Sequence, residues 1–325
     1  HLWAMVYLLQ KYFGRDGREE AEALLQRRSG DEDRPRILGA FNEETPDWLS
    51  FFMFTTFTDR DGKMQLESLA QSGFDPLART CRFMLTEEGH HMFVGRTGVE
   101  RVIQRTCEVM NKNGITDPDD IQAIRRFGVV DLPTIQKKIN FHTAVTLDLF
   151  GSEISTNAAN SFNAGLKGRF REHQIKDDHK LENDTYPVAQ VVDGEVKVLE
   201  VSALSAINAR LSDDYIADCE NVMKRWNRVI DEHQIRYHLH LPHRAFHRKV
   251  GEFSEVRVTP QGLLISDREW SKKYHDWLPS ESDLEYILSL MEPSLLPGEF
   301  SNWIAPPKAG INGQPGEYEY VRLVA

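Results

Sequence analysis

Two long apolar segments around a short breaker constrain the fold more than any other feature of the sequence. Residues 46–72 and 75–93 are each longer than a typical strand, and Gly-Phe-Asp-Pro at 73–76 separates them. Glycine and proline in such a breaker end one helix and start the next. We therefore expect an antiparallel pair of helices, with Thr45 as the N-cap and Pro46 at the first helical position.

Asp59 and Glu88 stand at matching positions in the two segments. Asp59 lies 14 residues before Gly73, and Glu88 lies 14 residues after Phe74. In an antiparallel hairpin both side chains are then about 21 Å from the turn and face each other. His91 follows Glu88 by three residues and shares its helical face. A carboxylate opposite a Glu-x-x-His pair is half of a di-iron site in a four-helix bundle.

Other interpretations of this segment remain open. Glu87 and His90 have the same spacing, so the motif alone does not fix which pair faces the partner helix. Glu-x-x-His also arises by chance on solvated helix surfaces. Asp59 favours a metal site, because a charge within an apolar helix is costly unless it is paired or ligated.

The chain starts at His1, inside an apolar helical pattern that has no N-cap residue before it. This start predicts that the beginning of the helix lies upstream. His1 could then be the histidine of a second Glu-x-x-His motif.

Segments spread along nearly the whole chain resemble the oxygenase subunit of the benzoyl-CoA 2,3-epoxidases. The resembling segments are residues 1–9, 13–20, 28–33, 46–54, 74–81, 166–170, 241–243 and 301–307. The resemblance implies a mainly α fold: a ferritin-like di-iron four-helix bundle, N-terminally truncated, with extra helices and small β-hairpins. It matches His1, Asp59, Glu88 and His91 to four iron ligands. The two remaining glutamates would lie before His1, so we expect the chain alone to hold iron poorly.

The same resemblance implies a chemistry. Two iron ions and O₂ would epoxidise benzoyl-CoA to 2,3-epoxybenzoyl-CoA in aerobic benzoate degradation, with Asp59, Glu88 and His91 as the catalytic residues. Electrons would come from NADPH through a separate reductase that carries flavin and iron–sulfur clusters. A related di-iron monooxygenase of another aryl-CoA and a non-catalytic ferritin-like scaffold remain alternatives.

The rest of the chain divides at about residue 180. We expect residues 1–180 to form the bundle, and 181–325 a mixed helix and hairpin region with an extended arm anchored by Trp303 and Ile304. Hairpins are predicted around Asp193-Gly194 and at 260–262, because both turns separate strand-like runs. The further predicted helices span residues 97–113, 118–127, 132–150, 152–173 and 202–230.

Coenzyme A carries several phosphate charges, so a basic recess is required. The candidate substrate-binding residues are Lys167, Arg169 and Arg171 in one cluster, and His243, Arg244 and Arg248 in another. Solvated basic turns explain either cluster equally well. Phe51, Phe52, Phe54 and Phe57 lie near Asp59 and could line a pocket for the aromatic ring, although core packing is the simpler interpretation.

Composition narrows the possible partners. The net charge of −11 argues against nucleic-acid or anionic-membrane binding. Three separated cysteines form no C-x-x-C, which favours a reducing cytoplasm over a disulfide framework. The longest apolar run, residues 48–57, is too short to span a bilayer. An oligomer is possible.

Overall fold

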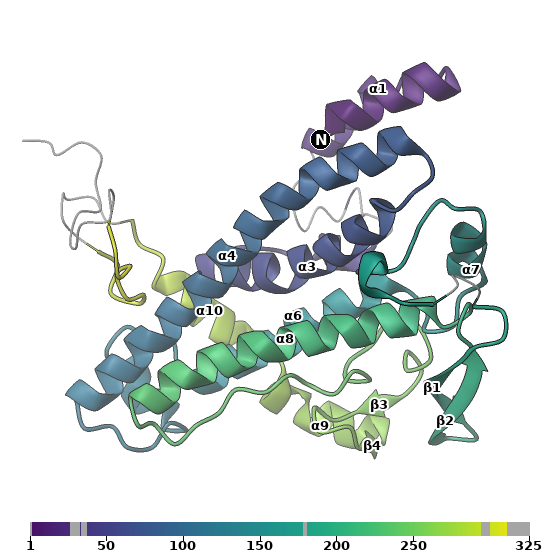
Figure 1. Ribbon diagram of the computed structural model, residues 1–325. Helices are drawn as coiled ribbons and strands as arrows, with labels where there is room; N and C mark the ends of the chain where they lie inside the picture. The colour runs from purple at the N-terminus through teal and green to yellow at the C-terminus, as the bar shows by residue number, and fades with distance from the viewer. Residues whose placement is uncertain (1, 27–32, 34–37, 178–180, 294–299, 311–325) are drawn as a thin grey trace, which may run out of the picture.

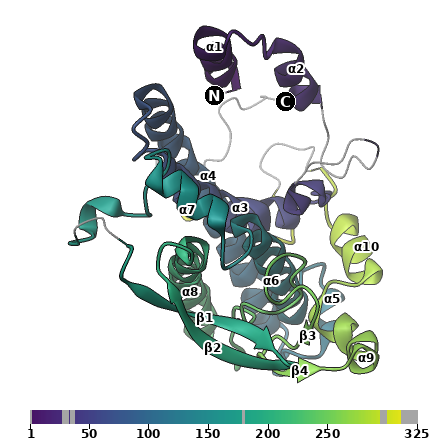
Figure 2. The same cartoon turned by 90° about the vertical axis from the view of Figure 1, so that its right-hand side faces the viewer.

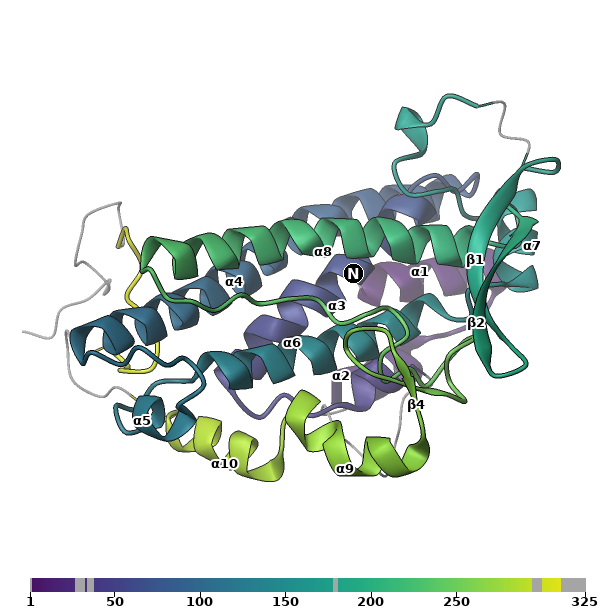
Figure 3. The ribbon, with the colours of Figure 1, turned by 90° about the horizontal axis from the view of Figure 1, so that it is seen from below.

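Four long helices run alongside one another and form the body of the protein (Figures 1 and 3). The computed structural model describes residues 2–26, 33, 38–177, 181–293 and 300–310. The four helices are α3 (Trp48–Leu69), α4 (Asp75–Lys112), α6 (Leu132–Leu147) and α8 (Ile207–Glu232). Their apolar faces share one core, to which α8 contributes Tyr215 and Trp226. The fold is mainly helical with two small antiparallel hairpins and fits a ferritin-like fold, as predicted.

Smaller elements surround this body. They are α1 (Leu2–Phe13), α2 (Arg18–Gln26), α5 (Ile121–Arg125), α7 (Thr156–Asn163), α9 (Asp267–Trp277), α10 (Glu281–Ser289) and the short 3₁₀ helices at Gly39–Asn42, Asp148–Phe150 and Glu172–Gln174. Figure 2 shows α1 and α2 together at the edge of the bundle. Tyr12, near the end of α1, packs edge-on against Phe74 in the turn between α3 and α4, with ring centroids 5.2 Å apart.

Both predicted hairpins are confirmed. β1 (Thr185–Val192) pairs with β2 (Glu195–Ser202), and β3 (Arg257–Val258) pairs with β4 (Leu264–Ile265). Asp193 and Gly194 both have positive φ, 56° and 78°, as the tight turn between β1 and β2 requires.

The predicted anchors of the C-terminal arm are also buried. Trp303 and Ile304 belong to the main core, and the Ala305 backbone N–H donates to the carbonyl oxygen of Arg101 at 3.1 Å. The arm is therefore fixed to α4.

The helix α4 is longer than the sequence predicted. The segments predicted as separate helices, 75–93 and 97–113, are parts of this single helix of 38 residues. Gly95 lies at the join, and its missing side chain serves packing instead of breaking the helix. A Cβ atom there would lie 2.7 Å from the carbonyl oxygen of Phe52 and 2.7 Å from the backbone nitrogen of Thr56. Only glycine lets α4 approach α3 this closely.

The prediction of the N-terminus of α3 was wrong. Asp47 is the N-cap instead of Thr45, and its carboxylate accepts from the backbone N–H of Ser50 at 2.7 Å. Lys138 of α6 lies 3.5 Å from the same carboxylate, Nζ to Oδ2. Aspartate is a preferred N-cap residue, and its negative charge is favourable at a helix N-terminus.

The predicted helix over residues 152–173 was also wrong. Only α7 is helical for more than one turn, and Gly165, with φ of 66°, follows its end. The Gly165 carbonyl oxygen accepts from the Gly73 backbone N–H at 2.7 Å. This segment is an irregular strap across the turn between α3 and α4, and its glycines permit a path that a helix could not take.

Within the described residues, no helix combines the length and apolar character needed to cross a membrane.

We expect the close contact at Gly95 to be essential for stability. Gly95→Ala should lower the free energy of unfolding by about 1–3 kcal/mol, because the new methyl group meets backbone atoms that cannot move independently. Gly89→Ala is the matched control in the same helix. No heavy atom lies within 4 Å of a Cβ there, so alanine should stabilise by about 0.5–1 kcal/mol. Urea unfolding of both variants tests this, and equal stability of the Gly95→Ala and wild-type proteins would contradict it.

Candidate metal centre

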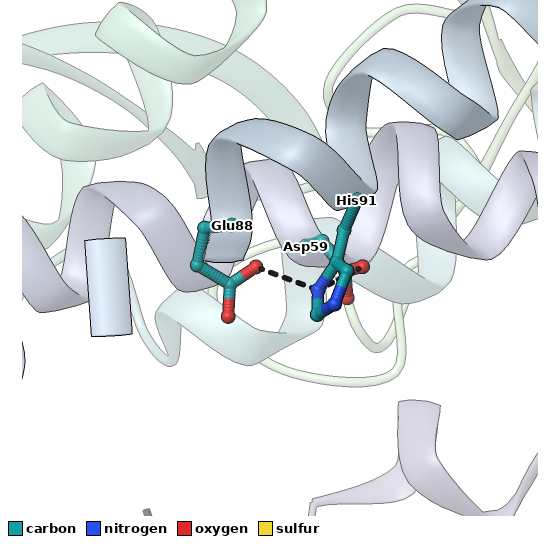
Figure 4. Close-up of side chains that lie close together, drawn as sticks. All are labelled: Asp59, Glu88 and His91. Atoms are coloured by element: carbon teal, nitrogen blue, oxygen red, sulfur yellow. Dashed lines mark ion pairs between the residues drawn. The ribbon is translucent and has the colours of Figure 1, made fainter. Parts of the chain in front are cut away.

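Asp59 of α3 and Glu88 and His91 of α4 converge between the two helices (Figure 4). Each offers one ligand atom, and the three atoms all lie within 4.8 Å of one another. His91 Nδ1 is 3.5 Å from Asp59 Oδ2 and 3.7 Å from Glu88 Oε2. The sequence therefore predicted correctly that these three residues meet.

The packing of the two helices determines this meeting. A Cβ atom at Gly98 would touch Phe52, one at Gly95 would touch Thr55, and one at Gly62 would lie 3.9 Å from the Glu88 carboxylate. His91 faces Asp59 in the same register. The structure thus differs from the predicted hairpin by about one helical turn: His91, not Glu88, is directly opposite Asp59. The symmetric residue count assumed that the centre of the turn lies between Gly73 and Phe74. The residues between Leu69, where α3 ends, and Asp75, where α4 begins, are not divided equally between the two helices.

The structure separates the two possible Glu-x-x-His pairs. Glu88 is partly buried and its carboxylate clusters with Asp59 and His91, whereas Glu87 and His90 are exposed and do not belong to this cluster. Glu88 and His91 are therefore the pair that faces the partner helix. The fourth predicted ligand, His1, lies outside the described residues.

The electrostatics of the three residues favour a bound cation. Burial and the nearby charge of Glu88 raise the pKa of Asp59 to about 6. Burial also raises the pKa of Glu88. Glu88 Oε2 is buried and accepts no hydrogen bond from any described residue. Two crowded carboxylates with an orphaned buried oxygen are costly in the free protein, and a metal ion would relieve that cost.

The donor set also fits. Carboxylate oxygens suit hard cations and imidazole suits iron, zinc and copper, so two carboxylates with one imidazole are compatible with iron. His91 keeps 46% of its side chain exposed, while Asp59 keeps 17%. The cluster is thus open on the His91 side, where further ligands can approach.

The aromatic side chains near Asp59 mostly pack the core. Phe57 is fully buried, with its ring 6.2 Å from that of Trp226, and Phe52 is buried against Gly98. Phe51 is partly exposed, and Phe54 packs near Phe41 with ring centroids 6.4 Å apart. Core packing therefore accounts for Phe52 and Phe57.

The first basic cluster borders the strap. Lys167 Nζ donates to Gln65 Oε1 at 2.7 Å, and burial lowers the pKa of Lys167. Arg169 is buried and makes 2.6 Å ion pairs with Glu172 and Asp177. Arg171 lies over the Phe170 ring, 4.8 Å from its centroid, and lines a hollow of about 320 Å³.

The second cluster is held by carboxylates. Arg248 is buried between Asp148 and Glu153, at 2.7 and 3.1 Å. Arg244 pairs with Asp213. His243 is partly buried against Gly262, and its Nδ1 accepts from the Ala245 backbone N–H at 3.2 Å. Each arginine of this cluster already has an internal counter-charge.

Sequence reasoning missed a third basic cluster. Arg60 and Lys63 of α3, Arg96 of α4 and Arg225 of α8 line one hollow. Arg60 and Lys63 lie one helical turn apart in the first of the two predicted helices, and that spacing was the available signal.

Comparison with known proteins gives one strong similarity. The chain is 60% identical over 323 residues to benzoyl-CoA oxygenase component B of Aromatoleum evansii. The match covers 99% of this chain and 68% of that protein. No protein-family model matches the chain.

The geometry generates a test of the ligand register. In the full-length protein, Glu88→Ala should weaken iron binding by more than about 100-fold. Loss of a residue that only hydrogen-bonds to a metal ligand costs about 10- to 100-fold in affinity, and loss of a ligand should cost more. Glu87→Ala, one residue away and exposed, should leave iron content nearly unchanged. Metal analysis after anaerobic loading with Fe(II) measures both. Loss of iron in Glu87→Ala with retention in Glu88→Ala would shift the register to Glu87 and His90.

Proposed function

The chain belongs to the family of benzoyl-CoA oxygenase component B, and from this premise we propose that it is the oxygenase component that acts on benzoyl-CoA. The observation that carries the proposal is the 60% identity to one such protein along nearly the whole chain. The product we propose is 2,3-epoxybenzoyl-CoA, with one oxygen atom from O₂ in the epoxide and the other reduced to water.

We further propose that Asp59, Glu88 and His91 hold iron, together with His1 and with carboxylates from elsewhere in the protein. The orphaned Glu88 oxygen and the raised pKa of Asp59 support this assignment. When bound, the two iron ions would supply the activation of O₂. In di-iron sites of helical bundles, each half of the site consists of one helix that supplies a carboxylate and one helix that supplies a Glu-x-x-His motif. Here α3 supplies Asp59, and α4 supplies Glu88 and His91.

The residues of this chain would position the metal and shield it. Both carboxylates are mostly buried, and the glycine contacts hold α3 against α4, so their oxygens are fixed before a metal binds. Such preorganisation lowers the cost of binding and fixes the direction in which open positions point.

The relative is called component B, which describes one member of a multi-component system. For this chain we propose a separate reductase that carries flavin and iron–sulfur clusters and supplies electrons from NADPH. The cysteines Cys81, Cys107 and Cys219 are buried and unpaired, which supports a reducing, cytoplasmic setting.

For the coenzyme A moiety, Arg171 is the best supported of the candidate residues, because Lys167 is partly buried and already donates to Gln65. Arg171 lines a hollow and its cation has no carboxylate partner within 4 Å in the described residues. Arg169, Arg244 and Arg248 would have to exchange an internal carboxylate for a phosphate, and His243 is partly buried against Gly262.

Turnover under ¹⁸O₂ tests the proposed reaction. The full-length protein with its reductase and NADPH should convert benzoyl-CoA to a CoA-bound product with one ¹⁸O atom, and should not consume free benzoate. The physical reason is that the acyl carrier supplies binding energy remote from the ring, which can position the ring for reaction.

Mass spectrometry of the products measures the label, and H₂¹⁸O with unlabelled O₂ is the control. Labelled products from free benzoate would contradict the proposal. Preferential turnover of phenylacetyl-CoA would assign the protein to another aryl-CoA.

A further inference from the structure

A basic hollow lies on the α8 side of the α3–α4 pair. Its volume is about 250 Å³, and α3, α4 and α8 all contribute to its lining. The lining holds four basic side chains, Arg60, Lys63, Arg96 and Arg225, but a single acidic one, Asp218. Arg60 follows Asp59 in α3, and successive residues of a helix point about 100° apart, so the basic hollow and the acidic cluster lie on different sides of α3.

Several donors in this hollow lack acceptors. Nε and Nη1 of Arg60 are buried and have no hydrogen-bond partner among the described residues, although Asp218 Oδ2 lies 3.3 Å from Nε. Arg60 as a whole is only 4% exposed. Nε of Arg96 is likewise buried without a partner. Buried guanidinium donors without acceptors carry a desolvation cost, which the Arg60–Asp218 ion pair offsets only in part.

The positive charges are also crowded. Arg225 pairs with Glu100, and Lys63 Nζ is 3.9 Å from Glu67 Oε1, but Arg96 makes no ion pair with a described residue. Burial and the neighbouring charges of Arg225 and Arg60 lower the pKa of Arg96, and Glu100 and Asp218 only partly oppose this. An anion in the hollow would relieve both the repulsion and the missing hydrogen bonds.

We propose that this hollow is a binding site for a phosphate group, separate from the metal centre and from the two basic clusters predicted for coenzyme A. A phosphate has several acceptor oxygens arranged around one centre, which suits guanidinium groups arriving from three helices. A single carboxylate has fewer acceptors to offer to four cations. The group belongs either to the nucleotide end of an acyl carrier or to free inorganic phosphate.

Direct binding tests the site without turnover, so the result does not depend on the proposed reaction. The probes are inorganic phosphate and adenosine 3′,5′-bisphosphate, titrated calorimetrically into the full-length protein at constant ionic strength. Tighter binding of the bisphosphate by about tenfold or more would identify the nucleotide of an acyl carrier as the source. Equal affinities would identify inorganic phosphate.

Arg96→Gln should weaken binding of the probe by about tenfold or more, because a charge-assisted hydrogen bond is lost. Arg225→Gln should act in the same direction. Arg228→Gln is the matched control: Arg228 lies on the same helix, is exposed and does not line the hollow. Its affinity should equal that of the wild type.

Thermal unfolding separates a binding role from a structural one. In phosphate-free buffer Arg96→Gln should unfold at the same temperature as the wild type or higher, and phosphate should no longer stabilise it. Absence of binding by either probe would overturn the proposal. So would unchanged affinity in Arg96→Gln together with a lower unfolding temperature.

Discussion

The backbones of α3 and α4 come into contact where α4 has glycine, and much of the molecule depends on this contact. With no side chain at Gly95 and Gly98, α3 presents Thr55 and Phe52 directly to the α4 backbone. The resulting register puts His91 opposite Asp59 and Glu88 beside Gly62. A shift of a single residue would rotate each of these side chains by about 100° and disperse the cluster.

The same helix pair separates opposite charges. Asp59 and Glu88 concentrate negative charge on one side, while Arg60 and Arg96 concentrate positive charge toward α8. Each side keeps a buried polar atom without a partner. Both clusters are more costly to bury alone than with a ligand of the opposite charge, which is the physical link between the metal centre and the phosphate site that we propose.

The sequence predicted the features that depend on local chemistry. The breaker at 73–76 ended one helix and started the next, the Asp193-Gly194 turn formed a hairpin, and the spacing of Asp59, Glu88 and His91 predicted their meeting.

Features that depend on distant partners were not predictable in this way. The sequence around Gly95 looks the same whether the glycine ends a helix or allows a second helix to pack closely against it. Only the position of α3 distinguishes the two cases. Asp47, not Thr45, caps α3 and lies 3.5 Å from Lys138 of the distant helix α6. Arg225 likewise reaches the basic hollow from a helix far along the chain.

The placement of α8 has a consequence for the order of folding. The three residues of the candidate metal centre lie within one helical hairpin, so only a short loop must close to bring them together, at small entropic cost. The basic hollow requires α8, which follows the strap, the β1–β2 hairpin and more than a hundred residues of chain after α3. Contacts of such long sequence separation form slowly. A nascent chain would therefore assemble its acidic cluster first and its basic hollow only when α8 docks, so the affinity for an anion would report the docking of α8.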